Sequence, residues 1–423
     1  MLQVNFIKNN RQEIIERLAI KNFTDIPLID LIVQLDSERK SLQFEHDEIQ
    51  SKINVASREI GELMLKGNKS LAEEKKVEVA KFKSLIEPLI ARLQIVEKDL
   101  KSDLLSLPNL PHKSVPAGKT PEENEVVRKT GDVPKLYKGA VPHWELAKKY
   151  DLIDFELGNK VTGSGFPFYK NKGARLQRAL IQYFLDYNVA AGYTEYQPPF
   201  MVNEASAFGT GQLPDKEGQM YFVNEDSLFL IPTAEVPITN IFRNEIVKEN
   251  NLPLKMTAYT PCFRREAGSY GKDVRGLNRV HQFDKVEIVQ IVHPEKSYDV
   301  IEEMALHIEK LLQNLELPYR ILRLCGGDMS FTSALTYDFE VYSAAQEKWL
   351  EVSSVSNFET FQSNRMKIRF KNIEGKTHLV HTLNGSSLAL PRIVAALLEN
   401  NQDKNGINLP GALHSYFGSD KIN

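Results

Sequence analysis

The sequence predicts an α+β protein in which an all-α N-terminal arm precedes a domain that combines strands and helices. In two stretches between residues 32 and 107, apolar residues recur every seven positions, the pattern of a coiled coil. Between residues 260 and 291 the period changes to two on both sides of a polar, glycine-containing loop, which indicates a β-hairpin. Helical and strand patterns then alternate to the C-terminus, so the second domain mixes both kinds of element.

Composition places the chain among ordinary globular proteins. With 423 residues, 42% hydrophobic and 26% charged, it is long enough for two or three domains. No run near 18 apolar residues occurs, and the N-terminus has no signal-peptide or transit character, so we expect a cytosolic enzyme and no membrane contact. Cys262 and Cys325 lack metal-ligand spacing and fit a reducing compartment. The formal charge of −3 means that any RNA contact must come from local patches.

The N-terminal region predicts helices. A short helix is expected over Gln12–Lys21, and the two heptad stretches are expected to form a hairpin about 50 Å long, broken at Gly67, Asn68 and Lys69. The first stretch has Leu35, Leu42, Ile49, Ala56 and Leu63 at one seam position and Ile32, Ile53 and Ile60 at the other, interrupted by Arg39 and His46; the second has Phe82, Leu89 and Val96, with Ile86, Leu93, Leu100 and Leu107. Pro88 predicts a kink or a break, and Pro108 and Pro111 end the arm.

The arm carries lysines near its expected tip. Lys66, Lys69, Lys75, Lys76, Lys81 and Lys83 could lie against nucleic-acid phosphates. Glu73, Glu74 and Glu78 interleave them, however, so a dimerisation coiled coil or a solvated face explains the same composition.

Further elements follow in order. Residues 112–139, rich in Pro, Lys and Glu, predict a linker, and a helix is expected over Gly173–Gly192. The prolines at 198 and 199 confine the next extended segment, TEYQPPFMV, to a sheet edge or an interface. Beyond the hairpin we expect a helix at His307–Leu315, strands at Pro318–Leu324, Phe331–Ser343 and Trp349–Asn357, and an Asn-Gly-Ser turn before a helix that starts at Pro391.

The hairpin at residues 260–291 has a distinctive face. Phe283, Lys285 and Glu287 share one side of the second strand, while Cys262, Arg264 and Glu266 share one side of the first; Gly268, Gly271 and Gly276 punctuate the loop. Phe283 and Glu287 should lie about 13 Å apart, enough to separate a ring from an amine of one ligand. A salt-bridged outer sheet face would explain the charges but needs neither Phe283 nor three glycines.

The sequence FRRE, a loop and HQFDKVE closely resembles motif 2 of class II aminoacyl-tRNA synthetases, and RREAGSYGKDVRGLNRVHQFDKVE resembles the seryl-tRNA synthetases. The resemblance covers nearly the whole chain, although the arm matches in pattern rather than in residues. It implies a tRNA-binding domain at residues 1–108 with a coiled-coil hairpin at about 30–107, a linker at 109–140, and a catalytic domain at 141–423 on an antiparallel sheet. It also implies a homodimer through the helix and strand that resemble motif 1, and a grip of the arm on tRNA(Ser). Whether tRNA(Sec) is a second substrate stays open.

The resemblance also implies site residues. Those for L-serine are Thr233, Ala234, Glu235, Arg264, Glu287 and Ser386, and those for ATP are Arg264, Arg265, Glu266, Arg279, Phe283, Glu351, Val352, Ser353, Ser354 and Arg392. Phe283 would stack on adenine with Glu266 near its amino group, Glu287 would bind the ammonium group of serine, and Glu351 and Ser354 would hold Mg²⁺. Spacing of three puts these last two on opposite faces of a regular strand, so the assignment needs a bulge or a strong twist.

Local sequence alone supports plainer interpretations of the same residues. Thr233 and Glu235 could cap the following helix, the serine-rich strand at Trp349–Asn357 could be a solvent-facing ladder, and Arg392 could be an interface residue. Arg392 does sit in the first turn of its helix, where free backbone N–H groups favour a phosphate. Neither a GxxxxGKS/T nor a GxGxxG motif occurs, so ATP binding would rely on arginines of the sheet.

The resemblance implies a mechanism, and two alternative functions remain open. Arg264 would lie between the serine carboxylate and the α-phosphate, Arg279 and Arg392 would bind the outer phosphates, and no protein nucleophile is required; Arg264 and Arg392 are the expected catalytic residues. One rival is a sibling synthetase or ligase with another acceptor. The other is a coiled-coil interaction protein that carries an inactive ATP-binding domain.

Overall fold

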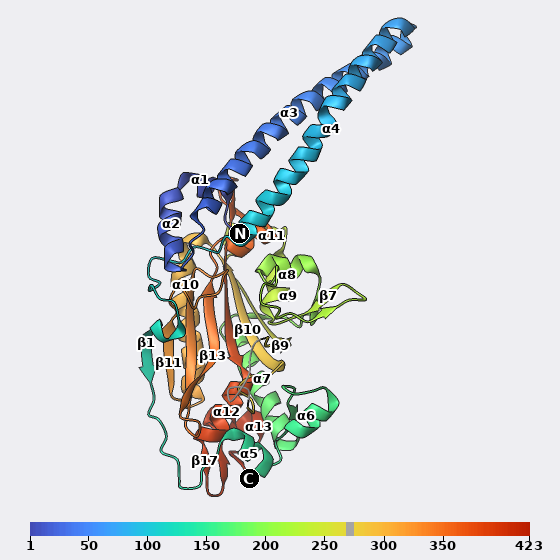
Figure 1. The fold of residues 1–423 in the computed structure, drawn as a ribbon. Coiled ribbons are helices and arrows are strands. Elements are labelled where there is room, and N and C mark those ends of the chain that lie inside the picture. The colour runs from blue at the N-terminus through green and yellow to red at the C-terminus, as the bar shows by residue number, and fades with distance from the viewer. Residues whose placement is uncertain (268–274) are drawn as a thin grey trace. The chain divides into compact units, whose positions relative to one another are not determined.

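The computed structural model describes residues 1–267 and 275–423 (Figure 1). Gly268 and Gly271, expected to punctuate the hairpin loop, lie outside the described residues. The chain divides into two units, one of residues 1–19 and 23–108 and the other of residues 20–22 and 109–423. Each unit is described by itself below.

The smaller unit is helical. It contains α1 (Val4–Asn9), most of α2 (Arg11–Ile20), α3 (Ile26–Leu65) and α4 (Lys69–Ser106). The predicted helix at Gln12–Lys21 is confirmed by α2, whose Ile14 and Leu18 are fully buried. At the start of α3, the Asp25 carboxylate accepts a hydrogen bond from Leu28 N–H and so satisfies one of the free donors of the first turn.

Helices α3 and α4 form the predicted antiparallel coiled-coil hairpin. Among the seam positions, Ile32, Leu35, Ile53 and Ala56 of α3 and Ile86, Val96 and Leu100 of α4 are buried. The turn falls at Gly67, whose φ of +78° is a conformation that suits glycine. The prediction of a break at Pro88 is wrong, because α4 runs through it without interruption. Pro88 is exposed and the buried seam continues on both sides of it, so side-chain packing outweighs one missing backbone hydrogen bond.

The larger unit is built on an eight-stranded sheet with the order β1-β11-β12-β13-β16-β10-β9-β4. Its strands are β1 (Glu125–Thr130), β4 (Thr194–Glu195), β9 (Leu254–Phe263), β10 (Gln282–Val292), β11 (Tyr319–Arg323), β12 (Leu335–Ser343), β13 (Lys348–Asn357) and β16 (His381–Ala389). Every neighbouring pair is antiparallel except β4 and β9, which are parallel. The predicted α+β fold with an antiparallel sheet is therefore confirmed.

Helices cover this sheet, and small sheets border it. The helices are α5 (His143–Lys149), α6 (Phe155–Val161), α7 (Asn171–Ala190), α8 (Glu204–Thr210), α9 (Glu235–Thr239), α10 (Ser297–Asn314), α11 (Phe361–Met366), α12 (Leu390–Asn400) and α13 (His414–Phe417). The small sheets pair β2 (Ile153–Asp154) with β3 (Phe168–Tyr169), β5 (Met201–Val202) and β6 (Phe222–Val223) with β7 (Leu228–Leu230), β8 (Ile246–Lys248) and β15 (Thr377–Leu379) with β14 (Arg369–Lys371), and β17 (Gln402–Asp403) and β19 (Lys421–Ile422) with β18 (Gly406–Asn408).

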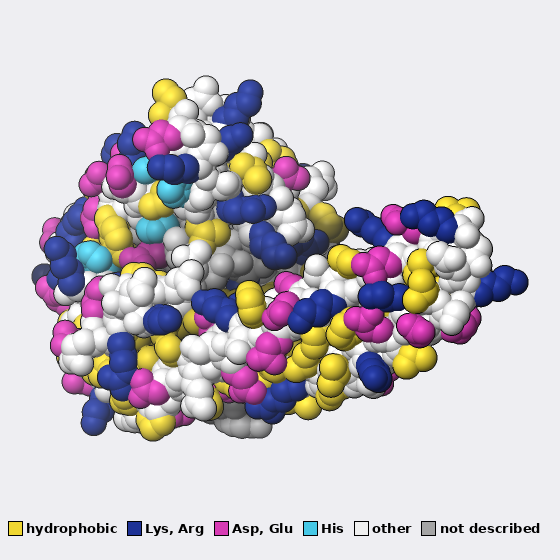
Figure 2. Space-filling model, turned by 90° about the horizontal axis from the view of Figure 1, so that it is seen from above, with side chains coloured by type: hydrophobic (Ala, Val, Ile, Leu, Met, Phe, Trp, Pro, Cys, Tyr) yellow, Lys and Arg dark blue, Asp and Glu magenta, His cyan; other side chains and the backbone are white. Residues whose placement is uncertain are grey.

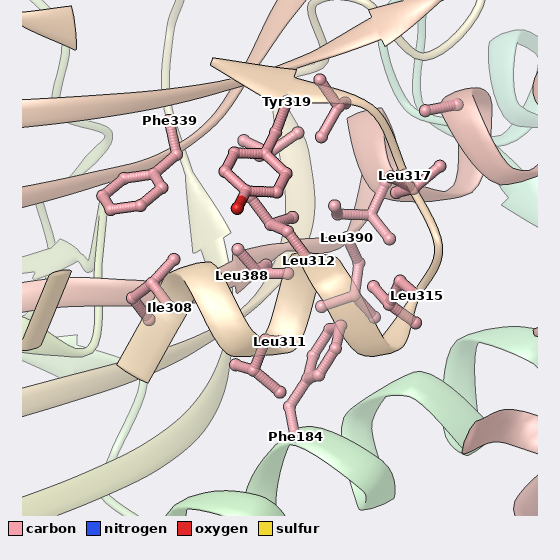
Figure 3. Close-up of a cluster of buried hydrophobic side chains, with 14 of the residues drawn as sticks. Phe184, Ile308, Leu311, Leu312, Leu315, Leu317, Tyr319, Phe339, Leu388 and Leu390 are labelled. Carbon is pink, nitrogen blue, oxygen red and sulfur yellow. The ribbon is translucent and has the colours of Figure 1, made fainter. Parts of the chain in front are cut away.

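The main core lies between the sheet and helices α7, α10 and α12. Figure 3 shows Ile308, Leu311 and Leu312 of α10 gathered with Tyr319 and Phe339 of the sheet, beside Phe184 of α7. The predicted helix at Gly173–Gly192 is confirmed as α7 and buries the apolar stripe that predicted it. Among the described residues, no helix has both the length and the apolar character needed to cross a lipid bilayer.

Two local structures differ from those expected. The region expected to be a linker, 109–140, includes an unexpected strand, β1, which pairs with β11 at the edge of the sheet and is exposed along its whole length. The Asn-Gly-Ser segment expected to turn lies inside β16, between β13 and β10. A Cβ on Gly385 would lie 3.2 Å from Val355 and 3.5 Å from Ile288 and Met304, so this glycine serves close packing rather than a turn.

Candidate active site

The hairpin of β9 and β10 brings Arg264 and Phe283 together. Phe283 pairs with Cys262 across the ladder, and Arg264, just past β9, continues the pairing by donating its N–H to the carbonyl of His281 (2.9 Å). The guanidinium of Arg264 lies 5.3 Å from the centroid of the Phe283 ring, and its Nε donates to the carbonyl of Pro232 (3.4 Å). An aromatic surface and a partly buried cation therefore stand side by side, as the strand period predicted.

Glu266 does not belong to the first strand, and this part of the face prediction is wrong. The strand ends at Phe263, and Glu266 has a φ of +47°, so its backbone no longer alternates. Its carboxylate instead accepts a hydrogen bond from Nη1 of Arg279 (3.0 Å). The structure thus unites these two residues by an ion pair across the base of the loop.

Arg265 turns toward a different part of the unit. Its N–H donates to the carbonyl of Gln219 (2.9 Å), and its guanidinium lies 5.8 Å from the ring centroid of Tyr221. The two adjacent arginines therefore contact different surroundings, Arg264 facing the strands of the hairpin and Arg265 the segment before β6.

A buried polar cluster lies further along the same face of β10. Thr233, Lys285 and Glu287 are each no more than 5% exposed. Thr233 Oγ1 donates to Oε2 of Glu287 (3.1 Å) and accepts from Nζ of Lys285 (2.8 Å), while Lys285 and Glu287 form a close ion pair. Oε1 of Glu287 is buried with no hydrogen-bond partner among the described residues. An acceptor kept in this state is costly unless a donor from a ligand completes it.

Glu235 forms the second acidic side of this cluster. It is 5% exposed and accepts a hydrogen bond from Nε2 of Gln362 (2.7 Å). Burial and the nearby negative charge of Glu287 raise the pKa of Glu235 to about 7. Thr233 also accepts the N–H of Glu235 (3.2 Å) at the start of α9, so the capping interpretation holds alongside a place in the cluster; Ala234, between them, is fully buried.

Ser386 completes the cluster from the neighbouring strand. It pairs with Glu287 across the β10–β16 ladder and is 8% exposed. Its carbonyl accepts a hydrogen bond from Oγ of Ser353 (2.6 Å), which couples β16 to β13 at this level of the sheet. The residues expected to hold serine therefore lie on adjoining elements of one region.

The bulge that the metal assignment required is present in β13. Glu351 pairs with Glu340, whereas Ser353 pairs with Phe339, so Val352 is the extra residue. Because Glu340 and Asp338 share one side of β12, their partners Glu351 and Ser354 also share a side. Ser354 Oγ donates to Oδ1 of Asp338 (2.5 Å), and burial, together with the charge of Glu351, raises the pKa of Asp338.

Two of the residues expected at ATP have side chains with contacts elsewhere in the unit. The side chain of Val352 belongs to the hydrophobic core, and the hydroxyl of Ser353 is directed at the carbonyl of Ser386. The side chain of Glu351, by contrast, is half exposed.

Arg392 lies beside Glu351. Its helix, α12, has Pro391 in the first turn as predicted. Nε of Arg392 donates to the carbonyl of Asn278 (3.0 Å) and Nη1 to the carbonyl of Glu351 (2.8 Å), with the Glu351 carboxylate 3.6 Å away. The guanidinium is thereby held at the junction of β13, α12 and the end of the hairpin loop.

The sequence missed several residues of this region. Lys285 was placed on the right face by the strand period but not paired with Glu287. Gln362, Asp338 and Asn278 carry no local signal, because their roles depend on elements distant in the chain. No group of three or more His, Cys, Asp or Glu residues suited to a metal ion occurs in the described ranges.

Comparison with known proteins gives a consistent result. A family model for the seryl-tRNA synthetase N-terminal domain matches residues 1–111, and one for the tRNA synthetase class II core domain (G, H, P, S and T) matches residues 221–401. The serine–tRNA ligase of Salinibacter ruber is 50% identical over 424 residues, which cover 100% of this chain and 99% of that protein.

Solved structures agree with the sequence comparison. The seryl-tRNA synthetase from Pyrococcus horikoshii, complexed with ATP, has a TM-score of 0.90 and 32% identity over 100% of this chain and 99% of that one. The cytoplasmic serine–tRNA ligase from Naegleria fowleri, complexed with AMP, has a TM-score of 0.85 and 26% identity over 100% and 98%.

Proposed function

The chain belongs to the seryl-tRNA synthetases and catalyses the ATP-dependent attachment of serine to tRNA, and from this premise we propose how its own residues do so. The neighbourhood of Arg264, Phe283 and Glu287 is the proposed binding surface for both small substrates. ATP and serine would meet at Arg264, with the base on one side and the amino acid on the other.

Serine binds in the polar cluster. Its ammonium group donates to the buried Oε1 of Glu287, the acceptor that has no partner among the described residues. Its hydroxyl donates to Glu235 or Ser386, which lie next to Glu287. Alanine would leave these buried groups unpaired, and such a loss is worth roughly 10⁴ to 10⁵ in selectivity. Lys285 and Thr233 both contact Oε2 of Glu287, which leaves Oε1 for the substrate.

ATP binds along the sheet. The adenine stacks on Phe283 with Glu266 near its amino group, and Arg279, the ion-pair partner of Glu266, contacts the outer phosphates. Arg392, held by two backbone carbonyls in the first turn of α12, contacts the outer phosphates. The carboxylate of Glu351 lies 3.6 Å from its guanidinium.

Glu351 and Ser354 are the proposed magnesium ligands. The bulge at Val352 puts both on one side of β13, and Glu351 is half exposed, so the donor set fits a hard cation that also takes phosphate oxygens. Mg²⁺ bound there would neutralise phosphate charge. Asp338 accepts a hydrogen bond from the hydroxyl of Ser354, which leaves the lone pairs of that hydroxyl available to the cation.

The reaction needs positioning and charge neutralisation rather than a protein nucleophile. An oxygen of the serine carboxylate attacks the α-phosphorus, the bond to the bridging oxygen breaks, and pyrophosphate leaves with the bond electrons. Arg264 contacts both the carboxylate and the α-phosphate and stabilises the charge that develops between them. The 3′-terminal ribose hydroxyl of tRNA then attacks the seryl carbonyl and AMP leaves.

Residues 1–108 are the proposed tRNA-binding domain, with the hairpin at about 30–107 contacting tRNA(Ser). Lys75 and Lys76 are ion-paired with glutamates, whereas Lys66, Lys69, Lys81 and Lys83 are exposed and have no ion pair among the described residues, so these four are the proposed phosphate contacts. Figure 2 shows basic side chains interspersed with acidic ones on one face of the molecule, which favours local contacts over a broad basic surface.

Three further proposals concern the state of the enzyme. We propose a homodimer formed through α7 and β4, because β4 is the terminal strand of the sheet and its outer backbone groups are available for pairing. We place the enzyme in the cytoplasm. tRNA(Sec) is a second candidate acceptor, and charging assays with both purified tRNAs decide between one acceptor and two.

The unpartnered oxygen of Glu287, on the strand that also carries Phe283, the partner of Arg264, is the observation that carries the proposal. ATP–pyrophosphate exchange measured with the purified protein and each standard amino acid tests it. Exchange should depend on serine, with alanine and threonine at the background level. Exchange supported best by another amino acid would show that the cluster is not a serine pocket.

A further inference from the structure

Three successive residues of the short helix α5 contact the returning end of the hairpin loop. Nε2 of the fully buried His143 accepts the backbone N–H of Leu277 (2.9 Å). The ring of Trp144 lies 4.6 Å from the guanidinium of Arg275, and the carboxylate of Glu145 lies 3.6 Å from it. One helix outside the sheet thus holds residues 275–277, immediately before Asn278 and Arg279.

The partners of His143 fix its tautomer. Its Nδ1 lies 2.7 Å from Oε1 of Glu399, a buried carboxyl. Burial alone would raise the pKa of Glu399, but hydrogen bonds from His143 and Ser343 hold that pKa below its ordinary value. An ionised carboxylate only accepts, so Nδ1 carries the proton; Nε2, which accepts from Leu277, carries none. The imidazole thus donates through Nδ1, accepts through Nε2 and links Glu399 to the loop backbone in one orientation.

The same network extends to Arg392. Glu399 accepts a hydrogen bond from Nε2 of Gln346 (2.9 Å), and Oε1 of Gln346 accepts one from Nδ2 of Asn278 (2.9 Å). The carbonyl of Asn278 in turn accepts Nε of Arg392 (3.0 Å). One network thus holds the backbone N–H of Leu277 through His143 and the side chain of Asn278 through Gln346. The carbonyl of Asn278, which orients Arg392, belongs to the residue held in this way.

The loop sequence accommodates this contact at Gly276. Its φ is +67°, and a Cβ there would lie 2.3 Å from Nε2 of His143. Any side chain at this position would push the imidazole away from Leu277 or displace the loop.

We propose that His143 is a positioning residue for ATP: through Leu277 and Asn278 it sets the orientation of Arg392 without touching either substrate. The proposal rests on the proposed contact between Arg392 and the ATP phosphates. The proposal assigns different roles to the two ring nitrogens. The hydrogen bond that Nε2 accepts from Leu277 positions the loop and, through it, Arg392. The bond donated by Nδ1 only anchors the ring.

Two isosteric substitutions separate these bonds. The amide of asparagine reaches the position of Nδ1 and can donate to Glu399, whereas the amide oxygen of glutamine reaches the position of Nε2 and can accept from Leu277. The KM values for ATP and for serine are measured by ATP–pyrophosphate exchange for wild type, His143→Asn, His143→Gln and Arg392→Ala, together with their thermal unfolding midpoints.

His143→Asn should raise KM for ATP by about tenfold, since it leaves a buried N–H unpaired, while KM for serine stays within about twofold of wild type. His143→Gln should stay within about threefold of wild type for ATP, even if its unfolding midpoint falls as far as that of the asparagine variant. A larger increase in KM for ATP in His143→Gln than in His143→Asn would overturn the proposal. Equal increases in KM for ATP and for serine that follow the fall in unfolding midpoint would also overturn it.

Two further variants complete the experiment. Arg392→Ala should raise KM for ATP at least as much as His143→Asn; an unchanged value would remove the proposed ATP contact itself and with it the premise of the inference. Gly276→Ala perturbs the contact between His143 and Leu277 from the loop side. It tests the proposal even if neither variant at position 143 folds. It should also raise KM for ATP selectively, and a wild-type value in this variant contradicts the proposed positioning.

Discussion

Glu235 is expected to make the stability of the larger unit depend on pH. It is buried beside the negative charge of Glu287, and both burial and that charge raise its pKa to about 7 from an ordinary value of 4.5. Hydrogen bonds from Gln362 and Asn384 and the charge of Lys285 offset only part of the shift. Replacement of Glu235 by glutamine keeps the shape and an acceptor oxygen but removes the ionisation.

The size and direction of the effect follow from the shift. One pKa unit corresponds to about 1.4 kcal/mol, so ionisation of Glu235 in the folded protein costs about 3 kcal/mol relative to the unfolded chain. The pKa of Glu235 is higher in the folded protein than in the unfolded chain, so its protonated form favours folding. This contribution to the free energy of unfolding is fully present below pH 4.5 and is lost as the pH rises through about 7. Relative to Glu235→Gln, wild type should therefore become less stable by about 3 kcal/mol between pH 4 and pH 9.

Urea unfolding followed by tryptophan fluorescence measures this difference. The chain has two tryptophans, Trp144 and Trp349, and both lie in the larger unit, so the signal reports on that unit alone. Groups that titrate independently of Glu235 are common to the two proteins and cancel when the free energies of unfolding are subtracted. A difference that stays constant across the pH range would show that Glu235 has an ordinary pKa and is not desolvated.

Three other perturbations test separate parts of the site. Phe283→Ala should raise KM for ATP by roughly tenfold or more and leave KM for serine near wild type, because base stacking is worth about 1–3 kcal/mol; equal changes in both constants would argue against stacking. Glu351→Gln should raise the Mg²⁺ concentration for half-maximal exchange on the order of tenfold, read from a magnesium titration, whereas an unshifted titration would remove Glu351 as a ligand. Deletion of residues 30–107 should spare serine-dependent exchange and abolish tRNA charging, and equal loss of both would mean that the arm does not act separately.

The features that the sequence predicted are those with a local period. The heptads gave the hairpin of α3 and α4, and the period of two put Phe283 and Glu287 on one face of β10. The assignment of Glu351 and Ser354 to one cation required a bulge or a strong twist, because a regular strand could not place both on one side, and the bulge is present. In each case a pattern within a few residues fixes the geometry.

The features that the sequence did not predict depend on distant elements. Strand β1 has no apolar face and is a strand only because β11 offers an edge to it. Gly385 follows an asparagine, a turn signal that burial between two strands overrides. The partners of His143 and Lys285 are set by packing between segments far apart in the chain, so composition and spacing say nothing about them.

The most direct test of the account is serine-dependent ATP–pyrophosphate exchange by wild type, Arg264→Ala and a matched control. Arg323→Ala is that control, because Arg323 lies on β11 of the same sheet and pairs with Glu125 near its edge. Arg264→Ala should lose roughly 10²- to 10³-fold in rate, as expected when a charge that stabilises the transition state is removed, while Arg323→Ala keeps the wild-type rate. A wild-type rate in Arg264→Ala would contradict the claim that serine and ATP meet at this arginine.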